Sequence, residues 1–346
     1  MIVQAPQSGP GLWPGSQITG KPQPTGKSQA GEPIIEVKGL YKSFAPKAKP
    51  LIYAVRDLNL AVGRGEILGL VGESGCGKTT LGKLMLRLER PTQGQILFGG
   101  QDIATLGFTA LRAIRHRMQM IFQGTANAFN PYYSVNRIIG EPLENYARGA
   151  SFSERTEMVV SLLAQVGLGP EYLGRYPSEM SGGQRQRVGI ARALILNPEF
   201  VVCDESVSSV DHAAKDRILE LLANFRRERG CSYLFISHDL ASVAKICDRV
   251  AVMYLGNLVE VLPRPDSPPL HPYTQALAAA FLSPDPRRRG NGKALFKDGA
   301  EIGTRPAGCP FSDRCLYAMG ICHKAQPLLT DRGDGRLAAC HLESNP

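Results

Sequence analysis

The chain has 346 residues, a length that favours one large α/β domain with extensions, or two domains, and allows a full core without disulfide staples. Hydrophobic residues make up 43%, charged residues 21% and aromatic residues 7%, which excludes collagen-like, mucin-like and wholly disordered proteins. The 40 Lys and Arg exceed the 31 Asp and Glu by nine, and this excess suits an anionic ligand, an anionic lipid or nucleic acid. No apolar run approaches the roughly 18 residues that cross a bilayer.

Residues 1–31 are rich in Pro, Gly, Ser and Gln and lack the features of a secretory signal, so they predict a disordered, cytoplasmic lead-in. Strand-like stretches follow at about 34–40 and 66–72, on either side of a third at 54–62, and indicate an antiparallel edge leading into a buried strand. After Gly77 apolar residues recur at helical spacing. A strand, a glycine-rich loop and a helix are therefore expected in that order.

The rest of the chain divides into three parts by its hydrophobic patterns and composition. From about 127 to 182 strand patterns give way to helices broken by turns, which predicts a mainly helical subdomain. Strand and helix patterns then alternate from about 184 to 254, as is typical of a parallel sheet, and a hairpin follows. We therefore predict an α/β domain over 32–263 and a Pro-, Arg- and Cys-rich extension over 264–346.

The glycine-rich loop, residues 72–80 (GESGCGKTT), matches the phosphate-binding pattern G-x-x-x-x-G-K-[ST]. Its glycines let backbone N–H groups converge on phosphate oxygens, and the helix N-terminus adds a favourable dipole. Lys78 can approach the β- and γ-phosphates, while the Thr79 hydroxyl can ligate Mg²⁺. The sequence therefore predicts a nucleoside triphosphate site formed by Gly72, Ser74, Gly75, Cys76, Gly77, Lys78, Thr79 and Thr80.

An acidic residue is also expected at the end of a buried strand, because a magnesium-bound phosphate needs a carboxylate near the metal. The segment EFVVCDE supplies Asp204 and Glu205. Asp204 is placed to hold the metal, through water, and Glu205 can orient or deprotonate the attacking water. These residues predict hydrolysis of the bound nucleotide.

The segment MSGGQRQR, residues 180–187, resembles the signature motif of ATP-binding cassette (ABC) ATPases. By itself it is a polar turn that opens a helix, with Ser181 as N-cap and free N–H groups that suit an anion. In that family the motif faces the γ-phosphate held by the other ATPase subunit. The resemblance implies an ABC-type fold, a mostly parallel sheet with an antiparallel β edge, and nucleotide contacts across a head-to-tail dimer by Ser181, Gly182, Gly183 and Gln184.

Other family landmarks occur in the expected order. Gln123 resembles the glutamine that contacts Mg²⁺ and the attacking water at the joint to the helical subdomain, and His238 resembles the histidine that contacts the γ-phosphate. Phe44 resembles the aromatic that stacks on adenine, and the segment that ends at Asp211 (SSVD) resembles the loop that bridges the subunits. The resemblance thus implies ATP as substrate, catalytic roles for Glu205, His238 and Gln123, and a Mg²⁺ site formed by Thr79, Gln123 and Asp204.

The C-terminal segments PLHPYTQAL and CPFSDRC are similar to the ATPase subunits of bacterial oligopeptide and dipeptide importers. The resemblance implies that ATP hydrolysis drives peptide import from the cytoplasmic face of the inner membrane. It also implies a second, different ATPase chain, two membrane-spanning permeases and a separate extracytoplasmic solute-binding protein. Nickel, glutathione or another small solute carried by the same subfamily is the alternative cargo.

Two other classes of function remain open from the residues alone. The net charge and the Arg triplet at 287–289 would permit a cytosolic cassette ATPase that acts on nucleic acid or ribosomes. Such proteins usually carry two cassettes or a long coiled-coil insertion, which this chain lacks, so no nucleic acid is expected. A redox or metal sensor that uses the tail cysteines is the third reading.

Four cysteines, Cys309, Cys315, Cys322 and Cys340, fall within the last 38 residues. Disulfides are unfavourable in the cytoplasm, and the absence of C-x₂-C pairs is atypical of a zinc ribbon. A [4Fe–4S] cluster, a Zn²⁺ ion and unligated thiols all stay open, with the cluster favoured because some importer ATPases of this type carry one. His323 and His341 adjoin two of the cysteines as substitute ligands.

Overall fold

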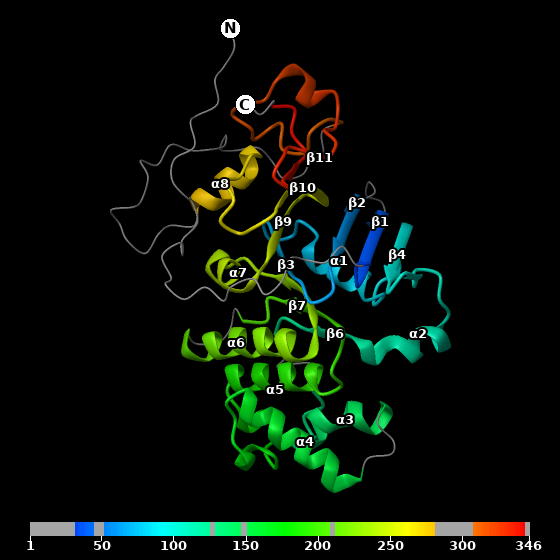
Figure 1. The fold of residues 1–346 in the computed structure, drawn as a ribbon, viewed down its shortest axis with the longest axis vertical. Helices are drawn as coiled ribbons and strands as arrows, with labels where there is room; N and C mark the ends of the chain where they lie inside the picture. Colours follow the sequence, from blue (N-terminus) through cyan, green and yellow to red (C-terminus); the bar gives the residue numbers. More distant parts are fainter. Residues whose placement is uncertain are drawn as a thin grey trace.

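The computed structural model describes residues 32–44, 52–124, 129–146, 151–207, 212–280 and 307–342. Figure 1 shows an elongated molecule with the C-terminal segment at one end and three helices at the other: α3 Val135–Tyr146, α4 Phe152–Gln165 and α5 Gly182–Leu194. The strands of the main sheet lie between these ends (Figure 1). The predicted lead-in, residues 1–31, and the Arg triplet at 287–289 lie outside the described residues.

The main sheet has eight strands in the order β11-β12-β10-β9-β3-β8-β7-β6. The run from β9 to β6 is parallel, whereas β10, β12 and β11 add an antiparallel edge. Strands β3, β7 and β8 are buried at every position, which explains their continuous apolar sequences. The predicted α/β fold is confirmed, with strands β3 Ile67–Val71, β6 Met118–Ile121, β7 Phe200–Asp204, β8 Ser232–Ile236, β9 Arg249–Tyr254, β10 Asn257–Leu262, β11 Thr330–Asp331 and β12 Leu337–Ala338.

The first strands of the chain form a sheet of their own. It is antiparallel, in the order β2-β1-β4-β5, and is separate from the edge of the main sheet to which the sequence pattern pointed. Its buried face shares one apolar core with Leu68 and Leu70 of β3 and with Leu84 of the helix α1, Lys78–Met85. The small sheet therefore packs against this part of the main sheet and α1. The strands are β1 Ile35–Phe44, β2 Ile52–Val62, β4 Gln93–Phe98 and β5 Gln101–Asp102.

Helices cover the main sheet and build the helical end of the molecule (Figure 1). Ser151 and Ser181 begin α4 and α5 with capping boxes, in which each serine accepts from the backbone N–H three residues later. The helices α3, α4 and α5 pack through buried residues such as Ile139, Val159 and Val188. The helices are α1 Lys78–Met85, α2 Phe108–Ile114, α3 Val135–Tyr146, α4 Phe152–Gln165, α5 Gly182–Leu194, α6 His212–Arg229, α7 Leu240–Ile246 and α8 Pro272–Ala280, with short 3₁₀ turns η1 Arg115–Arg117, η3 Pro170–Tyr172, η4 Pro177–Glu179 and η6 Gly320–His323.

A buried carboxyl group fixes the start of α8. The Glu260 side chain, on β10, is fully buried and accepts hydrogen bonds from the backbone N–H groups of Leu270, at 2.6 Å, and His271, at 3.2 Å. The ring Nδ1 of His271 in turn accepts from the backbone N–H of Tyr273 at 3.0 Å. Burial raises the pKa of Glu260 to about 7, against the hydrogen bonds it accepts, and lowers that of His271 to about 4.

Replacement of Glu260 by Gln should therefore change how stability depends on pH. A raised folded-state pKa contributes stability that is present below the unfolded pKa of about 4.5 and is lost as the pH rises through about 7. The stability of the wild type relative to Glu260→Gln should fall by about 2 kcal/mol between pH 5.5 and 8. The comparison isolates Glu260 because His271 is present in both proteins. Urea unfolding at both pH values measures the difference, and a relative stability that stays constant or rises would contradict it.

Candidate active site

The segment that leaves β3 and forms the first residues of α1, residues 72–80, is shaped by two glycines. Gly72 has φ +152° and Gly77 has φ +108°, in the region that favours glycine. A Cβ atom at Gly72 would lie 2.1 Å from the carbonyl oxygen of Met253, and one at Gly77 would lie 2.1 Å from that of Ala54. The loop therefore needs both glycines to pass between two neighbouring backbones. We refer to residues 72–80 as the phosphate loop.

The Lys78 ammonium group lies inside the phosphate loop. Its side chain is buried, and Nζ donates hydrogen bonds to the carbonyl oxygens of Gly72, at 2.7 Å, and Glu73, at 2.8 Å. The neighbouring Ser74 and Gly75 are exposed, so the loop can be approached from solvent beside this charge. An ammonium group surrounded by loop backbone is the arrangement that a phosphate-binding loop requires.

Asp204 and Thr79 form an oxygen pair beside the loop. The Thr79 hydroxyl donates to Oδ1 of Asp204 at 2.9 Å, and Asp204 is 3% exposed at the end of β7. Burial raises the pKa of Asp204, while the Thr79 hydroxyl and the nearby Lys83 and Lys78 oppose that rise. A hydroxyl and a carboxylate are the hard oxygen donors that Mg²⁺ prefers, so the residues present fit this ion.

Glu205 contacts the other two predicted catalytic side chains, Gln123 and His238, and we refer to these three residues as the Glu205 cluster. Its carboxylate accepts from Nε2 of Gln123 at 2.6 Å, and its other oxygen lies 3.2 Å from Nδ1 of His238. Gln123 follows β6, Glu205 follows β7 and His238 follows β8, so neighbouring strand ends supply all three groups. Glu205 has φ +47°, a strained value for a side chain of this size, and its N–H donates to the carbonyl of Ile236 at 3.0 Å.

The other predicted site residues have neighbours of their own. Ser181 caps α5, and Gln184 donates to the Ser181 hydroxyl from its N–H and to the Tyr172 hydroxyl from its amide. Phe44 ends β1, is 42% exposed and lies under Lys42, whose Nζ is 4.8 Å from the ring centroid. Asp211 lies outside the described residues. The roles assigned to these residues stay predictions.

The sequence patterns gave no sign of the contacts made by Glu73. Its N–H donates to the Tyr273 hydroxyl at 2.8 Å, and its carboxylate accepts from Nη1 of Arg314 at 2.9 Å. Both partners lie in segments, HPYT and CPFSDRC, that stand out in the sequence for their resemblance to importer ATPase subunits. A contact across 200 or 241 residues leaves no local pattern in a single sequence.

The tail cysteines approach one another without forming a metal site. Cys309, Cys315 and Cys322 are buried and Cys340 is partly buried. Burial, with smaller contributions from the neighbouring thiols, raises the pKa of Cys309 to about 12. In the described ranges, however, no set of three or more His, Cys, Asp or Glu side chains is arranged to hold a metal ion, so a cluster here would require these side chains to turn toward a common point.

The two histidines proposed as substitute ligands have other neighbours. The Nε2 atom of His341 lies 2.9 Å from the carbonyl oxygen of Ala325, and Nδ1 of His323 lies 3.7 Å from the carboxylate of Asp313. Neither contact directs an imidazole nitrogen to a group of thiols. The substitution of a histidine for one of the cysteines therefore stays a prediction.

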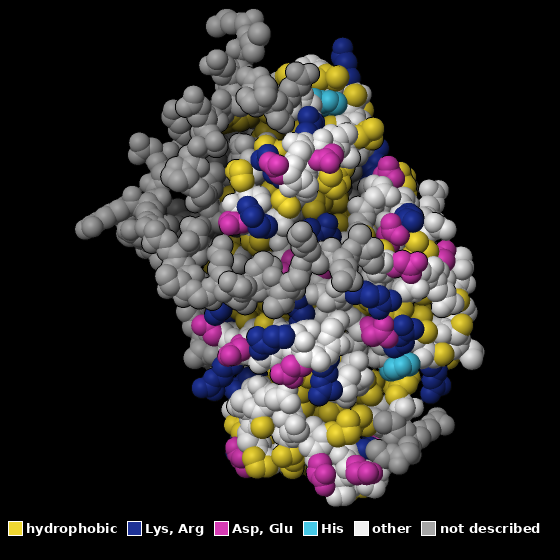
Figure 2. Space-filling model, in the orientation of Figure 1, with side chains coloured by type: hydrophobic (Ala, Val, Ile, Leu, Met, Phe, Trp, Pro, Cys, Tyr) yellow, Lys and Arg dark blue, Asp and Glu magenta, His cyan; other side chains and the backbone are white. Residues whose placement is uncertain are grey.

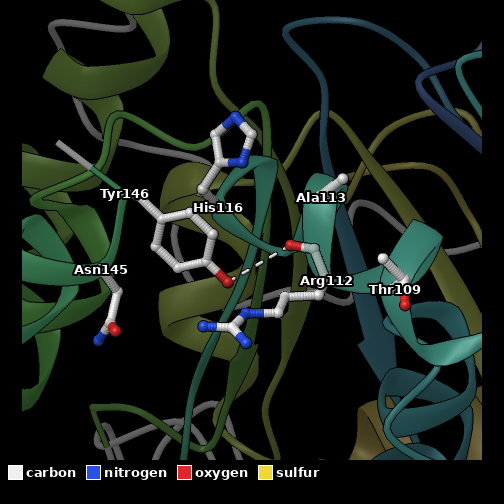
Figure 3. Close-up of a pocket in the computed structure, with 6 residues that line it drawn as sticks. All are labelled: Thr109, Arg112, Ala113, His116, Asn145 and Tyr146. Atoms are coloured by element: carbon white, nitrogen blue, oxygen red, sulfur yellow. Dashed lines mark hydrogen bonds between the residues drawn. The ribbon is translucent and has the colours of Figure 1, made fainter. Parts of the chain in front are cut away.

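A separate pocket of about 370 Å³ lies between α2 and the end of α3 (Figure 3). The Tyr146 hydroxyl donates to the carbonyl oxygen of Arg112 at 3.4 Å, and the rings of His116 and Tyr146 lie 5.4 Å apart. No predicted ATP-site residue lines it. Its lining residues are Thr109, Arg112, Ala113, His116, Asn145 and Tyr146.

Family models match two successive parts of the chain. The model described as ABC transporter matches residues 55–208, and the model described as oligopeptide/dipeptide transporter, C-terminal region, matches residues 259–322. The first match includes the phosphate loop and Glu205, and the second includes Tyr273 and Arg314.

Curated relatives and solved structures agree with these matches. The chain is 45% identical over 319 residues, 90% of each chain, to a probable peptide ABC transporter ATP-binding protein of Sinorhizobium fredii. It is 42% identical over 326 residues, 90% of this chain and 98% of the relative, to the oligopeptide transport ATP-binding protein AppF of Bacillus subtilis. The dimeric ATP-binding cassette MJ0796, solved in a post-hydrolysis state with ADP and Pi, has TM-score 0.62 and 28% identity, over 65% of this chain and 96% of that one. The chain therefore belongs to the ABC ATPases, in the family of peptide-transporter ATP-binding proteins.

Proposed function

We propose that this chain is the ATP-hydrolysing subunit that energises import of di- or oligopeptides across the bacterial inner membrane. The observation that carries the proposal is that one chain combines the phosphate loop and the Glu205 cluster with the C-terminal region typical of oligopeptide and dipeptide transporters. The names of its relatives support the same cargo. The proposal includes the division into an ATPase domain over 32–263, with a helical subdomain at about 127–182, and an extension over 264–346.

The proposed chemistry assigns a task to each group around the phosphate loop. Lys78 donates to phosphate oxygens from its position among the loop carbonyls, and the Glu205 carboxylate orients a water and accepts its proton. Gln123 and His238 hold that carboxylate from both sides. Thr79, Asp204 and Gln123 hold Mg²⁺, which neutralises phosphate charge when it is bound. Phe44 stacks on the adenine ring.

The signature residues belong to a composite site in the same proposal. Ser181 and Gly182 are exposed at the start of α5, where the helix dipole favours an anion. We assign Ser181, Gly182, Gly183 and Gln184 to a nucleotide held by a second, different ATPase chain, with Asp211 at the junction. The dimeric form of the related cassette MJ0796 supports this arrangement.

The partners would include two permeases at the cytoplasmic face of the membrane and an extracytoplasmic solute-binding protein. No described helix is both long and apolar enough to span a bilayer. Exposed aromatic residues near the joint to the helical subdomain support a protein contact: Phe108 is 81% exposed and Tyr132 is 85% exposed. On the face drawn in Figure 2, Lys and Arg are interspersed with Asp and Glu, whereas a nucleic-acid surface would gather basic residues.

The complete transporter should hydrolyse ATP faster than this chain alone, because the signature motif would serve a nucleotide on another polypeptide. Both ATPase chains and both permeases, reconstituted in vesicles with the solute-binding protein, should take up a labelled peptide in an ATP-dependent manner. The matched comparison is specific ATPase activity of the isolated chain and the complex. Equal activities would contradict the composite site, and uptake of nickel or glutathione without uptake of peptide would contradict the proposed cargo.

Replacement of Glu205 by Gln should leave ATP binding intact and slow turnover by roughly 10²- to 10⁴-fold, the contribution of a positioned base. Glutamine keeps the size of the side chain and removes the proton-accepting oxygen. Phosphate release by the reconstituted complex measures the change. Glu228→Gln, an exposed substitution in the last turn of α6, is the control and should be neutral. Turnover of Glu205→Gln near the wild-type rate would remove Glu205 from the catalytic role.

The tail cysteines carry a separate part of the proposal, that Cys309, Cys315, Cys322 and Cys340 bind a [4Fe–4S] cluster or, as the alternative, Zn²⁺. Four thiols in one segment support it as a donor set, although binding would require the side chains to turn toward a common point. Anaerobic purification should yield stoichiometric iron and sulfide, or zinc, that decreases in Cys315→Ser. A folded, metal-free tail would refute it.

A further inference from the structure

Glu73, the second residue of the phosphate loop, is held at three points. Its carbonyl oxygen accepts from Nζ of Lys78 at 2.8 Å, on the phosphate-binding side of the loop. Its N–H donates to the Tyr273 hydroxyl at 2.8 Å, and its carboxylate pairs with Arg314 at 2.9 Å. One residue therefore connects the lysine of the ATP site to two side chains from the C-terminal part of the chain.

The two side chains that contact Glu73 are themselves firmly placed. Tyr273 lies in the first turn of α8, whose start is set by Glu260, and its ring is 2% exposed. Three rings pack together beneath the loop: Tyr254 lies 4.6 Å from Tyr273 and 5.3 Å from Phe311 between centroids. Packed aromatic rings of this kind have little rotational freedom. The Tyr273 hydroxyl is thus presented to the loop by a rigid group.

Arg314 completes the contact from the tail. Its side chain is 15% exposed, and Nη1 also lies 3.3 Å from the Tyr254 hydroxyl, so the guanidinium group spans from the aromatic group to the loop carboxylate. The Glu73 carboxylate raises the pKa of Arg314 further above its usual value. An ion pair that is partly buried and fixed by a second hydrogen bond is stronger than an ordinary surface pair.

We propose that Tyr273 and Arg314 are positioning residues that hold Glu73, and through it the Lys78 end of the phosphate loop, so that the C-terminal extension sets the affinity of this chain for nucleotide. A loop already held in its binding shape loses less conformational entropy when the phosphates arrive. Both residues contact Glu73, the loop residue whose carbonyl oxygen accepts from Lys78. Their effect therefore falls on binding rather than on the hydrolytic step.

The coupling must also act in the opposite direction. If the extension favours the nucleotide-bound loop, bound nucleotide must stabilise the contacts of the extension by the same factor. Hydrogen exchange of residues 307–342 should therefore slow when nucleotide binds. The inference rests on nucleotide binding by the phosphate loop and is independent of the proposed peptide cargo and partner chains.

The test uses the full chain and ADP with Mg²⁺, which avoids both hydrolysis and the need for a second ATPase chain. Tyr273→Phe removes only the hydroxyl that accepts from Glu73, and Arg314→Gln removes the ion pair. Each should raise the dissociation constant of ADP by about 3- to 10-fold, the effect expected of one lost hydrogen bond or partly buried ion pair. Calorimetric titration measures the constants, and thermal unfolding verifies that the variants are folded.

A double-mutant cycle separates positioning from general destabilisation. Glu73→Gln and Arg314→Gln disrupt the same contact, so the double variant should bind ADP no more weakly than the weaker single variant. The reconstituted complex should show a raised KM for ATP with kcat within about twofold of the wild type. Nucleotide should slow hydrogen exchange of 307–342 in the wild type and less so in Arg314→Gln.

The matched control is Arg264→Gln, which breaks an exposed ion pair with Asp266 at 3.3 Å at the very start of the extension, away from Glu73 in sequence. It should leave the ADP affinity unchanged. Unchanged affinity in both Tyr273→Phe and Arg314→Gln would overturn the inference. So would losses that simply multiply in the Glu73→Gln, Arg314→Gln double variant. If Arg314→Gln does not fold, Tyr273→Phe decides alone, because it keeps the packed ring.

Discussion

Parallel pairing of β6, β7, β8 and β3 is the constraint on which the active site depends. Because parallel strands end at the same edge of the sheet, Gln123 after β6, Glu205 after β7 and His238 after β8 must follow one another along that edge. The phosphate loop leaves the same edge from β3, next to β8. Asp204 and Glu205 are consecutive and point in different directions, one to Thr79 and the other to Gln123 and His238.

Much of this arrangement could be predicted from the sequence because its signals are local. The glycine spacing of the phosphate loop, the acids after an apolar strand and the serine before α5 each lie within a few residues of the structure that they specify. The separate four-stranded sheet was not predicted, since alternation identifies strands but not which strand pairs with which. The contacts of Glu73 were missed for a similar reason: the hydroxyl and the guanidinium group that reach it are brought there by the order of strands in the sheet.

The tail illustrates the difference between a donor set and a site. Four cysteines in a short segment indicate possible metal ligands. Whether their sulfur atoms converge on one point depends on the backbone conformation of that segment. Here the backbone around Cys309 is bonded directly to that around Cys322, because the N–H of Cys309 donates to the carbonyl of Cys322 at 2.7 Å. The approach is close: a Cβ atom at Gly308 would lie 2.2 Å from the oxygen of that same carbonyl. Strand β12 also pairs with β10, so the main sheet organises this segment. Backbone pairing and burial of Phe311 can thus order the tail without a metal.

The pairing of β10 with β9 explains how the extension is brought next to the phosphate loop, which is distant from it in sequence. The turn between β9 and β10 contacts the phosphate loop directly, since the N–H of Gly256 donates to the carbonyl of Cys76 at 2.8 Å. Beyond that turn, β10 supplies Glu260 to fix the start of α8, and α8 returns Tyr273 to Glu73. A displacement of the extension would therefore have to break the contacts at Glu73, whereas the turn between β9 and β10 would keep its contact at Cys76. These two contacts lie on either side of the exposed Ser74 and Gly75. The part of the loop left open to phosphate is the part that the C-terminal segments do not hold.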